Sequence, residues 1–249
     1  SGKVDAMYTS NLHTRIANRV LLRISTFIAP STPVFFSRTS RIKWEYYVGH
    51  TANIDVRVST RRSRLNHKRK IAEALSSAID NRLAKVGLPA LERRKATPLI
   101  EIHVRFDNNE CTLSVNTSGE PLYKRGSKVQ LSGAAPIRET LAAGILACLG
   151  VEDADLILDP FCGTGTFLIE AAQMIENLPP GSSRVYAFQQ LAFFEQAKWE
   201  RIRRQSRPSP EPGELYECML LGLDISESNV DIATQNTKRF DELNLSIDK

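Results

Sequence analysis

The first half of the chain alternates between polar and apolar residues in patterns that predict a helix and several strands. In residues 68–86 the apolar positions recur every three or four residues, which is the spacing of one face of an α-helix. Residues 53–58, 100–106 and 111–115 change character at every position, as strands with one buried face do. The Asp107-Asn108-Asn109 segment predicts a hairpin turn between the last two strands. Further helices are expected over residues 6–22 and 34–47. This half therefore reads as a small α+β domain.

The second half repeats a different pattern, in which short apolar runs alternate with helical segments. Such an order predicts an open parallel sheet with helices packed against it. A long polar insertion interrupts the pattern at residues 178–213. The expected elements are a helix at 136–149 with Pro136 in its first turn, a strand at 156–159, a helix at 166–177, a strand at 217–224 and a helix at 231–243.

The fold class predicted for the whole chain is α/β. Residues 1–119 are expected to form the α+β domain with a preceding helical segment, and residues 120–135 a linker. Residues 136–249 would then hold the first part of a Rossmann-like sheet.

A glycine-bearing turn follows the first strand of that sheet and is the most informative motif. It reads Asp159-Pro160-Phe161-Cys162-Gly163-Thr164-Gly165-Thr166. The spacing lacks the Gly-Lys-Ser/Thr ending of a phosphate-binding loop and the third glycine of a dinucleotide site. An acid before the turn repels a pyrophosphate but suits a cationic ligand. S-adenosylmethionine, which carries a sulfonium and an ammonium and no phosphate, fits this turn best.

A second acid, Asp224, closes the strand that follows the insertion. In nucleoside-binding α/β folds an acid at this place accepts hydrogen bonds from the ribose hydroxyls. The alternative is that Asp224 acts at the start of the next helix, where Ser226 is also well placed as a cap.

The turn with its first helix, residues 159–172, resembles motif I of class I S-adenosylmethionine-dependent methyltransferases, in the form found in the THUMP-domain RNA methyltransferases. Residues 133–142, 122–126 and 10–22 resemble the segments that precede motif I in those enzymes, in the same order. Bacterial 23S rRNA guanine-N2-methyltransferases are the relatives that the chain resembles most. The resemblance implies direct methyl transfer to an exocyclic amine, and rRNA as the partner.

The resemblance also implies which residues hold the cofactor. The segment before motif I would help to hold its methionine end, although Glu139 is equally suited to cap a helix. No basic neighbour marks Cys162 as a nucleophile, so a packing role is expected for it. The cofactor-binding candidates are Pro136, Arg138, Glu139, Thr140, Asp159, Phe161, Cys162, Gly163, Thr164, Gly165, Thr166 and Asp224.

Basic residues concentrate in the region that resembles a THUMP domain, which is an RNA-binding module. No acid interrupts the run, which suits contacts to several phosphates, although a solvated surface is the alternative. The chain has a formal net charge of +5, which permits a nucleic-acid partner without requiring one. The RNA-binding candidates are Arg57, Arg61, Arg62, Arg64, Lys68, Arg69 and Lys70.

The sequence lacks the Asn/Asp-Pro-Pro-Tyr/Phe motif with which such enzymes hold the target amine. The Asn177-Leu178-Pro179-Pro180 segment is not that motif, because its order is broken and it lacks the aromatic residue. The sequence is therefore expected to be a piece of a longer protein, shortened at both ends and ending just after its second Rossmann helix, with its catalytic residues elsewhere. Alternatives are a module that only binds RNA, or a parent enzyme that methylates tRNA guanine or adenine N6.

Composition argues against several other kinds of site and partner. The four cysteines are scattered without a C-x-x-C pair, which argues against a zinc site and a disulfide framework and suits a reducing cytosol. No apolar run approaches the roughly 18 residues that a membrane span needs. We therefore expect a cytoplasmic protein with no metal and no membrane partner.

Overall fold

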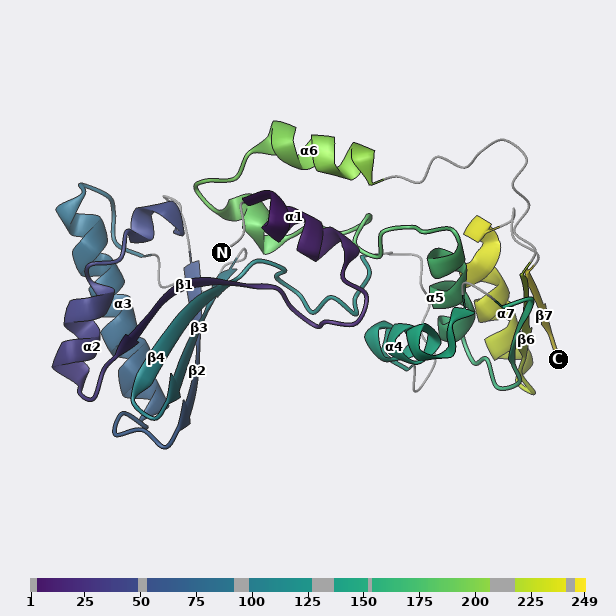
Figure 1. The fold of residues 1–249 in the computed structure, drawn as a ribbon, viewed down its shortest axis with the longest axis horizontal. Helices are drawn as coiled ribbons and strands as arrows, with labels where there is room; N and C mark the ends of the chain where they lie inside the picture. The colour runs from purple at the N-terminus through teal and green to yellow at the C-terminus, as the bar shows by residue number, and fades with distance from the viewer. Residues whose placement is uncertain are drawn as a thin grey trace. The chain divides into compact units, whose positions relative to one another are not determined.

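The computed structural model describes residues 4–48, 53–91, 99–126, 137–151, 154–206, 218–240 and 245–249. It divides into two compact units (Figure 1). The first comprises Ser1–Asn18, Pro121–Arg184 and Ala197–Lys249, and contains the motif I turn. The second comprises Arg19–Glu120 and Val185–Gln196, and contains most of the basic residues named above. We call them the motif I unit and the basic unit.

The basic unit is a four-stranded sheet with helices on one face (Figure 1). The strands lie in the order β1-β4-β3-β2, antiparallel except for the parallel pair β2 and β3. The bounds are β1 Leu21–Ile28, α2 Thr32–Thr39, η1 Trp44–Tyr46, β2 Asn53–Arg61, α3 Lys68–Lys85, β3 Leu99–Asp107, β4 Glu110–Asn116 and η3 Ala187–Gln190.

Alternation along β3 explains why helices cover only one face of this sheet. Ile100, Ile102, Val104 and Phe106 are buried, whereas the intervening residues are polar and at least partly exposed. Successive side chains of a strand point to opposite faces, so one face of the sheet packs on α2 and α3 and the other remains polar. The predicted hairpin is confirmed: Asn108 and Asn109 both have positive φ, at 50° and 64°, as a two-residue type I′ turn requires.

The motif I unit contains a parallel sheet in the order β5-β6-β7. Helix α4 packs along α5, α5 packs against β5 and β6, and α7 packs against β7 (Figure 1). The bounds are α1 Val4–His13, α4 Glu139–Leu149, β5 Leu156–Asp159, α5 Thr166–Ile175, α6 Gln196–Gln205, β6 Met219–Leu223, α7 Glu227–Thr237, η4 Lys238–Phe240 and β7 Leu245–Asp248. A strand-helix-strand order with a parallel sheet is the Rossmann-like arrangement expected for this part.

Several expectations for single elements are wrong. The helix expected over residues 6–22 ends at His13, and Leu21 and Leu22 belong to strand β1. A bulge between Arg23 and Ser25 breaks the alternation that would have marked this strand. The expected helix at 34–47 is instead α2 followed by the short helix η1.

The second half departs from expectation at its end and in its insertion. The polar insertion contains helix α6, in which only Trp199 and Ile202 are buried, so its apolar stripe is narrow. The last predicted helix begins earlier, at Glu227. The chain was expected to end just after that helix, and this is wrong, because β7 adds a third parallel strand at Leu245–Asp248.

The division into units also differs from the contiguous ranges expected from the sequence. The helix α1 precedes the basic unit in the chain yet belongs to the motif I unit, and Val185–Gln196 of the insertion belongs to the basic unit. Phe188 carries part of this second association, because its main-chain nitrogen donates to the Thr117 carbonyl at 2.9 Å.

Candidate functional site

The motif I turn is a closed loop between β5 and α5. Gly163 and Gly165 both have positive φ, at 56° and 83°, which favours glycine. A Cβ on Gly163 would meet nothing within 4 Å, so the space beside this residue is open to a ligand. Gly165 instead packs on Ala233 of α7 and forms the N-cap of α5. Thr164 and Thr166, the other loop residues predicted for the cofactor, are largely buried.

Asp224 lies at the end of β6 and is bonded to the motif I turn. Its Oδ2 accepts a 2.9 Å hydrogen bond from the main-chain nitrogen of Gly163. Its Oδ1 accepts from the Ser226 nitrogen at 2.9 Å and from the Asn229 side chain at 3.2 Å. The bond from Ser226 does most to lower the pKa of Asp224 below its usual value. The two acid anchors predicted from distant segments therefore meet at one edge of the sheet, and Asp224 also accepts a hydrogen bond from Ser226, the N-cap residue of α7.

Asp159 places a second carboxylate at this edge, and its surroundings favour the ionised form less than those of Asp224 do. Burial raises the pKa of Asp159, and the negative charge of Asp224 adds to that effect, while the hydrogen bond from the Phe161 nitrogen opposes it. A cation placed beside the turn would favour the charged carboxylate and so oppose both causes of the shift. The electrostatics of the edge therefore favour a positively charged ligand.

Two large apolar side chains project into solvent beside these acids. Phe161 is 87% exposed and Ile225 is 92% exposed, and they follow the ends of β5 and β6. Exposed apolar side chains grouped at one site are typical of a surface that a ligand covers. Sequence reasoning missed Ile225, although its place directly after an acid at a strand end was visible.

Cys162, predicted among the cofactor residues, is buried against β6. A Cβ on Gly222 would lie 3.2 Å from the Cys162 side chain and 2.5 Å from Cδ1 of Leu168. Burial raises the pKa of the Cys162 thiol to about 11, so the thiol stays protonated near neutral pH. Its role here is to pack the turn against the sheet, as the sequence suggested.

The residues predicted at the start of α4 are held by other protein groups. The Arg138 guanidinium lies 5.5 Å from the ring centre of Tyr123. The Thr140 hydroxyl is hydrogen-bonded to Asn18 at 3.3 Å. Burial raises the pKa of Glu139, and the neighbouring Glu170 raises it further. Pro136 lies outside the described residues.

A buried ion pair anchors motif I in a way that the sequence did not reveal. Arg125 and Glu170 form two parallel hydrogen bonds of 3.0 Å, with side-chain exposures of 4% and 0%. Arg125 also donates to the carbonyls of Leu122 and Arg15. The segment 122–126, which was expected to lie in the linker 120–135, thus belongs beside α5 in the motif I unit. The signal in the sequence was a glutamate at an otherwise apolar stretch of helix.

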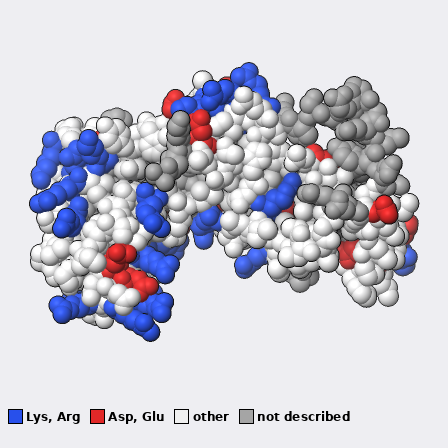
Figure 2. Space-filling view, viewed as in Figure 1, with Lys and Arg blue, Asp and Glu red and all other residues white. Residues whose placement is uncertain are grey.

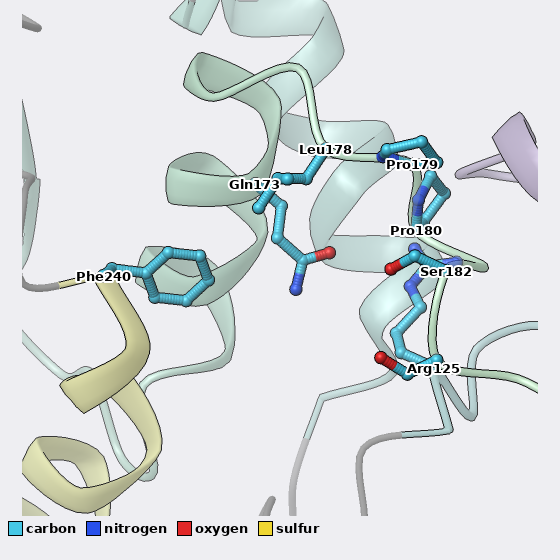
Figure 3. A pocket seen from close by; sticks show the side chains of 8 residues that line it. Arg125, Gln173, Leu178, Pro179, Pro180, Ser182 and Phe240 are labelled. Atoms are coloured by element: carbon cyan, nitrogen blue, oxygen red, sulfur yellow. The ribbon is translucent and has the colours of Figure 1, made fainter. Parts of the chain in front are cut away.

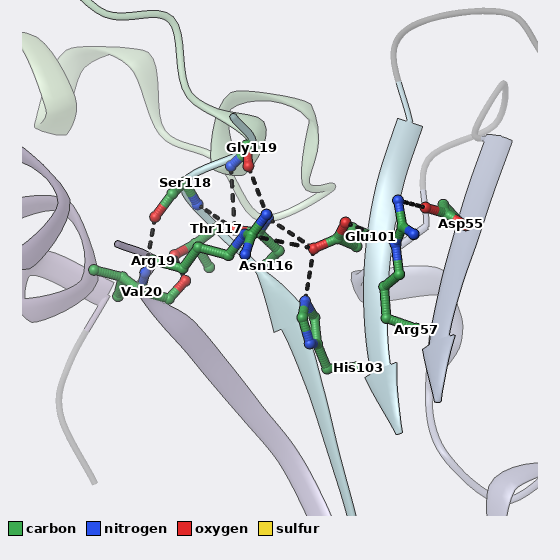
Figure 4. A network of polar contacts seen from close by, with 10 residues as sticks. All are labelled: Arg19, Val20, Asp55, Arg57, Glu101, His103, Asn116, Thr117, Ser118 and Gly119. Atoms are coloured by element: carbon green, nitrogen blue, oxygen red, sulfur yellow. Dashed lines mark hydrogen bonds and ion pairs between the residues drawn. The ribbon is translucent and has the colours of Figure 1, made fainter. Parts of the chain in front are cut away.

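The basic unit pairs several of the predicted RNA-binding cations with acids. Figure 4 shows Arg57 directed at Asp55, and its ion pairs with Asp55 and Glu101 measure 2.8 and 3.2 Å. Arg61 lies 3.9 Å from Asp107, and Arg69 lies 2.9 Å from Glu73. The run that no acid interrupts in the sequence is therefore partly neutralised by acids from other parts of the fold.

Four of the predicted cations have no ion pair in the described part of the chain. Lys and Arg side chains crowd the end of the basic unit where β2 leads into α3 (lower left of Figure 2). The loop there is fixed, because the Arg64 nitrogen donates to Asn109 at 2.8 Å and the Asn109 nitrogen donates to Ser63 at 2.9 Å. The unpaired and exposed cations are Arg62, Arg64, Lys68 and Lys70.

Across the described ranges, no group of three or more His, Cys, Asp or Glu residues is arranged to hold a metal ion. No helix in those same ranges has both the length and the apolar character needed to cross a membrane.

Comparisons with known proteins agree with this geometry. Residues 125–244 match the family model described as the methyltransferase domain of the RMKL-like proteins. The ribosomal RNA large subunit methyltransferase K/L of Methylococcus capsulatus is 29% identical over 96% of this chain, which spans 33% of that relative. The chain therefore spans about a third of the length of the curated relatives that it matches.

Two solved structures cover the whole chain. One is described as a predicted N6-adenine-specific DNA methylase from Listeria monocytogenes, with a TM-score of 0.86, 27% identity and 65% of its own length covered. The other is SMU.472, a putative methyltransferase complexed with SAH, with a TM-score of 0.84, 26% identity and 66% of its length covered. The motif I unit thus has the Rossmann-like fold of class I methyltransferases, and residues 125–244 are similar to the methyltransferase domain of the RMKL-like proteins.

Proposed function

We propose that this chain is part of an S-adenosylmethionine-dependent RNA methyltransferase that acts on ribosomal RNA. The observation that carries the proposal is the joint placement of Asp159, Gly163 and Asp224 at one sheet edge, within the range that matches a methyltransferase domain. This edge suits a cation and offers open space beside Gly163.

The cofactor is S-adenosylmethionine, and each part of the edge has a role toward it. Asp224 has accepted three hydrogen bonds, and a carboxylate has about four acceptor sites, so one remains for a ribose hydroxyl. Phe161 and Ile225 offer apolar surface to the adenosine. Asp159 faces the positive end of the cofactor. We also propose that the start of α4 lies near the methionine end of the cofactor. The residues concerned are Arg138, Glu139 and Thr140.

The proposed substrate is 23S rRNA, with the exocyclic N2 of guanine as the methyl acceptor. Support comes from the relative named as a ribosomal RNA large subunit methyltransferase. The basic unit would act as a THUMP-like RNA-binding domain, with Arg62, Arg64, Lys68 and Lys70 as its leading phosphate contacts. Because bacterial ribosomes are cytoplasmic, the proposal also places the protein there.

The reaction is a direct displacement. The amine nitrogen forms a bond to the methyl carbon, the carbon–sulfur bond breaks with its electron pair returning to sulfur, and the amine loses a proton. The sulfonium is already activated, so positioning of the two reactants dominates catalysis. The target base must leave its stack to reach the methyl group. The residues that orient the amine belong to a motif that this sequence does not contain.

A second candidate is methylation of adenine N6. The description of the Listeria monocytogenes structure as a predicted N6-adenine-specific DNA methylase favours it. The cofactor edge does not discriminate between the two, because both reactions need the same sulfonium beside an amine.

Incubation of the parent protein with labelled cofactor tests the proposal. Unmodified 23S rRNA and an adenine-containing DNA duplex serve as parallel substrates, and digestion to nucleosides identifies the product. Labelled N2-methylguanosine from the rRNA is the expected result. Label in N6-methyladenine would support the second candidate, and no label in either substrate would contradict both.

A further inference from the structure

A second group of exposed cations lies in the basic unit, at the end of α2 and in the turn that leads into η1. Arg38, Arg41 and Lys43 are all exposed, and none of them forms an ion pair in the described part of the chain. Figure 2 shows Lys and Arg side chains gathered at the upper left of this unit, where Figure 1 draws the ends of α2 and α3. The phosphate contacts proposed above, at the start of α3, do not include these three residues.

The acid nearest to them in the sequence is already neutralised. Glu45 is the sole acid within residues 29–48. Arg82, in the last turn of α3, donates to both oxygens of this carboxylate, from Nε at 3.0 Å and from Nη2. These hydrogen bonds do most to lower the pKa of Glu45 below its usual value. Within the described residues, the three cations therefore carry positive charge that no carboxylate offsets.

Tyr46 adds an aromatic ring to these cations. Tyr46 is 51% exposed, whereas Trp44 of the same short helix is completely buried and donates from its indole nitrogen to the Thr39 carbonyl at 2.8 Å. Because Trp44 is fixed in this way, η1 holds Tyr46 at the surface. The Lys43 ammonium lies 5.8 Å from the centre of the Tyr46 ring. We define the α2–η1 surface as Arg38, Arg41, Lys43 and Tyr46.

An exposed ring among unpaired cations is the combination that binds single-stranded nucleic acids. Bases stack on the ring, and the cations contact the phosphates on either side. The pocket of about 80 Å³ in the motif I unit lacks both features (Figure 3). Its charged residue, Arg125, is paired with Glu170 at 3.0 Å, and Phe240 in its lining is only 2% exposed.

Helix α3 separates the α2–η1 surface from the cations already proposed as phosphate contacts. The ion pair between Arg82 and Glu45 joins η1 to the last turn of α3, whereas Lys68 and Lys70 lie in its first turn. A helix of 18 residues is about 27 Å long. At roughly 3.4 Å for each stacked nucleotide, about eight nucleotides cover that distance. Contacts this far apart should contribute independently to binding.

We propose that the α2–η1 surface binds an unpaired segment of the RNA substrate, with one base stacked on Tyr46 and neighbouring phosphates contacted by Arg38, Arg41 and Lys43. The inference rests on the proposed function, because the rRNA supplies this segment. Every base has a face that can stack, so the surface contributes affinity without selecting a base. The RNA is thus held at both ends of α3.

Fluorescence anisotropy of the full 249-residue chain tests the stacking contact, with a 12-nucleotide oligouridine and a 12-base-pair RNA duplex as probes. Tyr46→Ala should weaken oligouridine binding by about 5-fold or more, and Tyr46→Phe, which keeps the ring, should stay within about 2-fold of the unmodified chain. Duplex binding should not change in Tyr46→Ala, because paired bases remain in their stack. Unchanged oligouridine affinity in Tyr46→Ala, or an equal loss on both probes, would overturn the proposal.

The cations are tested with the same oligouridine at several salt concentrations. Arg41→Ala should reduce the slope of log binding constant against log salt concentration by roughly 0.7, the value for one phosphate contact on a single strand. Arg57→Ala is the matched control, because Arg57 is paired with Asp55 and Glu101. The fold losses of Arg41→Ala and Arg62→Ala should multiply in the double variant. A double variant that binds as well as Arg62→Ala alone would overturn the proposal.

Crosslinking of the unmodified chain removes any dependence on how a variant folds. A 12-nucleotide RNA with 4-thiouridine at each position is irradiated with the chain, and mass spectrometry locates the crosslinks. They are expected in the tryptic peptide that begins at Trp44. Crosslinks confined to residues 61–70 would overturn this proposal and leave the proposed function intact. A folded chain that binds no RNA would contradict both.

Discussion

The main-chain nitrogen of Gly163 donates a 2.9 Å hydrogen bond to the carboxylate of Asp224, which ties the glycine turn after β5 to the end of β6. These residues are 61 positions apart, and a helix and the whole insertion separate them. The bond brings the open space beside Gly163 to the same edge as both acids. Its integrity is thus central to any account of cofactor binding.

The pH dependence of cofactor binding should follow the protonation of the Asp159 carboxyl. Its pKa is raised, chiefly by burial, so acidification protonates this carboxyl at a higher pH than an ordinary aspartate. Affinity for S-adenosylmethionine should therefore fall on acidification before Asp224, whose pKa is lowered, is protonated. Titration calorimetry between pH 4 and 7 measures this, and Asp159→Asn should flatten the profile. An unchanged profile in that variant would argue against a role for Asp159.

Asp159→Asn should also stabilise the folded chain at neutral pH. A raised folded-state pKa means that Asp159 contributes stability below its unfolded-state pKa, which is lost as pH rises through the folded value. Asparagine mimics the protonated form and can still accept from the Phe161 nitrogen. Urea denaturation at pH 7 should give a higher midpoint for the variant. A lower midpoint would show that the carboxylate is needed for folding.

Gly222 should be intolerant of alanine because β6 packs closely on motif I. The added Cβ would lie 2.5 Å from Leu168 and 3.2 Å from Cys162, so side chains of a packed core would have to move. We expect a loss of about 1–3 kcal/mol of unfolding free energy. Gly144→Ala is the control: it lies in helix α4, where its Cβ would meet Ile16 at an ordinary 3.8 Å, and should be neutral or stabilising. Similar losses in both variants would contradict the packing argument.

Arg125 and Glu170 should show strong coupling. Removal of one partner leaves a buried charge unpaired, which typically costs about 3–5 kcal/mol, so Arg125→Met and Glu170→Leu should each be severely destabilising. The double variant should recover much of that loss, because no unpaired charge remains. Denaturation of the unmodified chain, the two single variants and the double variant gives the unfolding free energies from which the coupling is calculated. Additive losses would show that the two charges act independently.

RNA binding should depend on the unpaired cations more than on the paired ones. Arg62→Ala and Arg64→Ala should each weaken binding to an rRNA fragment. Each should also reduce the slope of log binding constant against log salt concentration by roughly 0.7–0.9, the value for one phosphate contact. Arg57→Ala is the matched control, since Arg57 is held by Asp55 and Glu101. Filter binding at several salt concentrations measures both quantities. An effect of Arg57→Ala equal to that of Arg62→Ala would contradict this ranking.

The sequence predicted the elements whose apolar residues recur at a regular spacing, and the turns whose residues favour positive φ. The α3 helix has a continuous apolar stripe, the Asn108-Asn109 hairpin has the residues that positive φ requires, and the motif I turn has its glycines. Strand β1 escaped prediction because a bulge interrupts its alternation, and β7 was not predicted either.

Most contacts between segments far apart in the sequence could not be predicted. Asp224 could be placed beside motif I because parallel strands end at the same sheet edge. No such rule joins Arg125 to Glu170, or brings Asp107 to Arg61, because these contacts depend on how loops and strands pack. The sequence therefore identified the chemistry of the cofactor edge better than the charge balance of the basic surface.

The most direct test of the account is calorimetric titration of this chain with S-adenosylmethionine, beside Asp224→Ala and Asp231→Ala. Asp231 is an exposed acid of helix α7 and serves as the control for loss of one negative charge. We predict saturable binding that Asp231→Ala leaves intact and Asp224→Ala weakens by about 10-fold or more. Equal affinities in the two variants, or no binding by a chain that circular dichroism shows to be folded, would contradict this prediction.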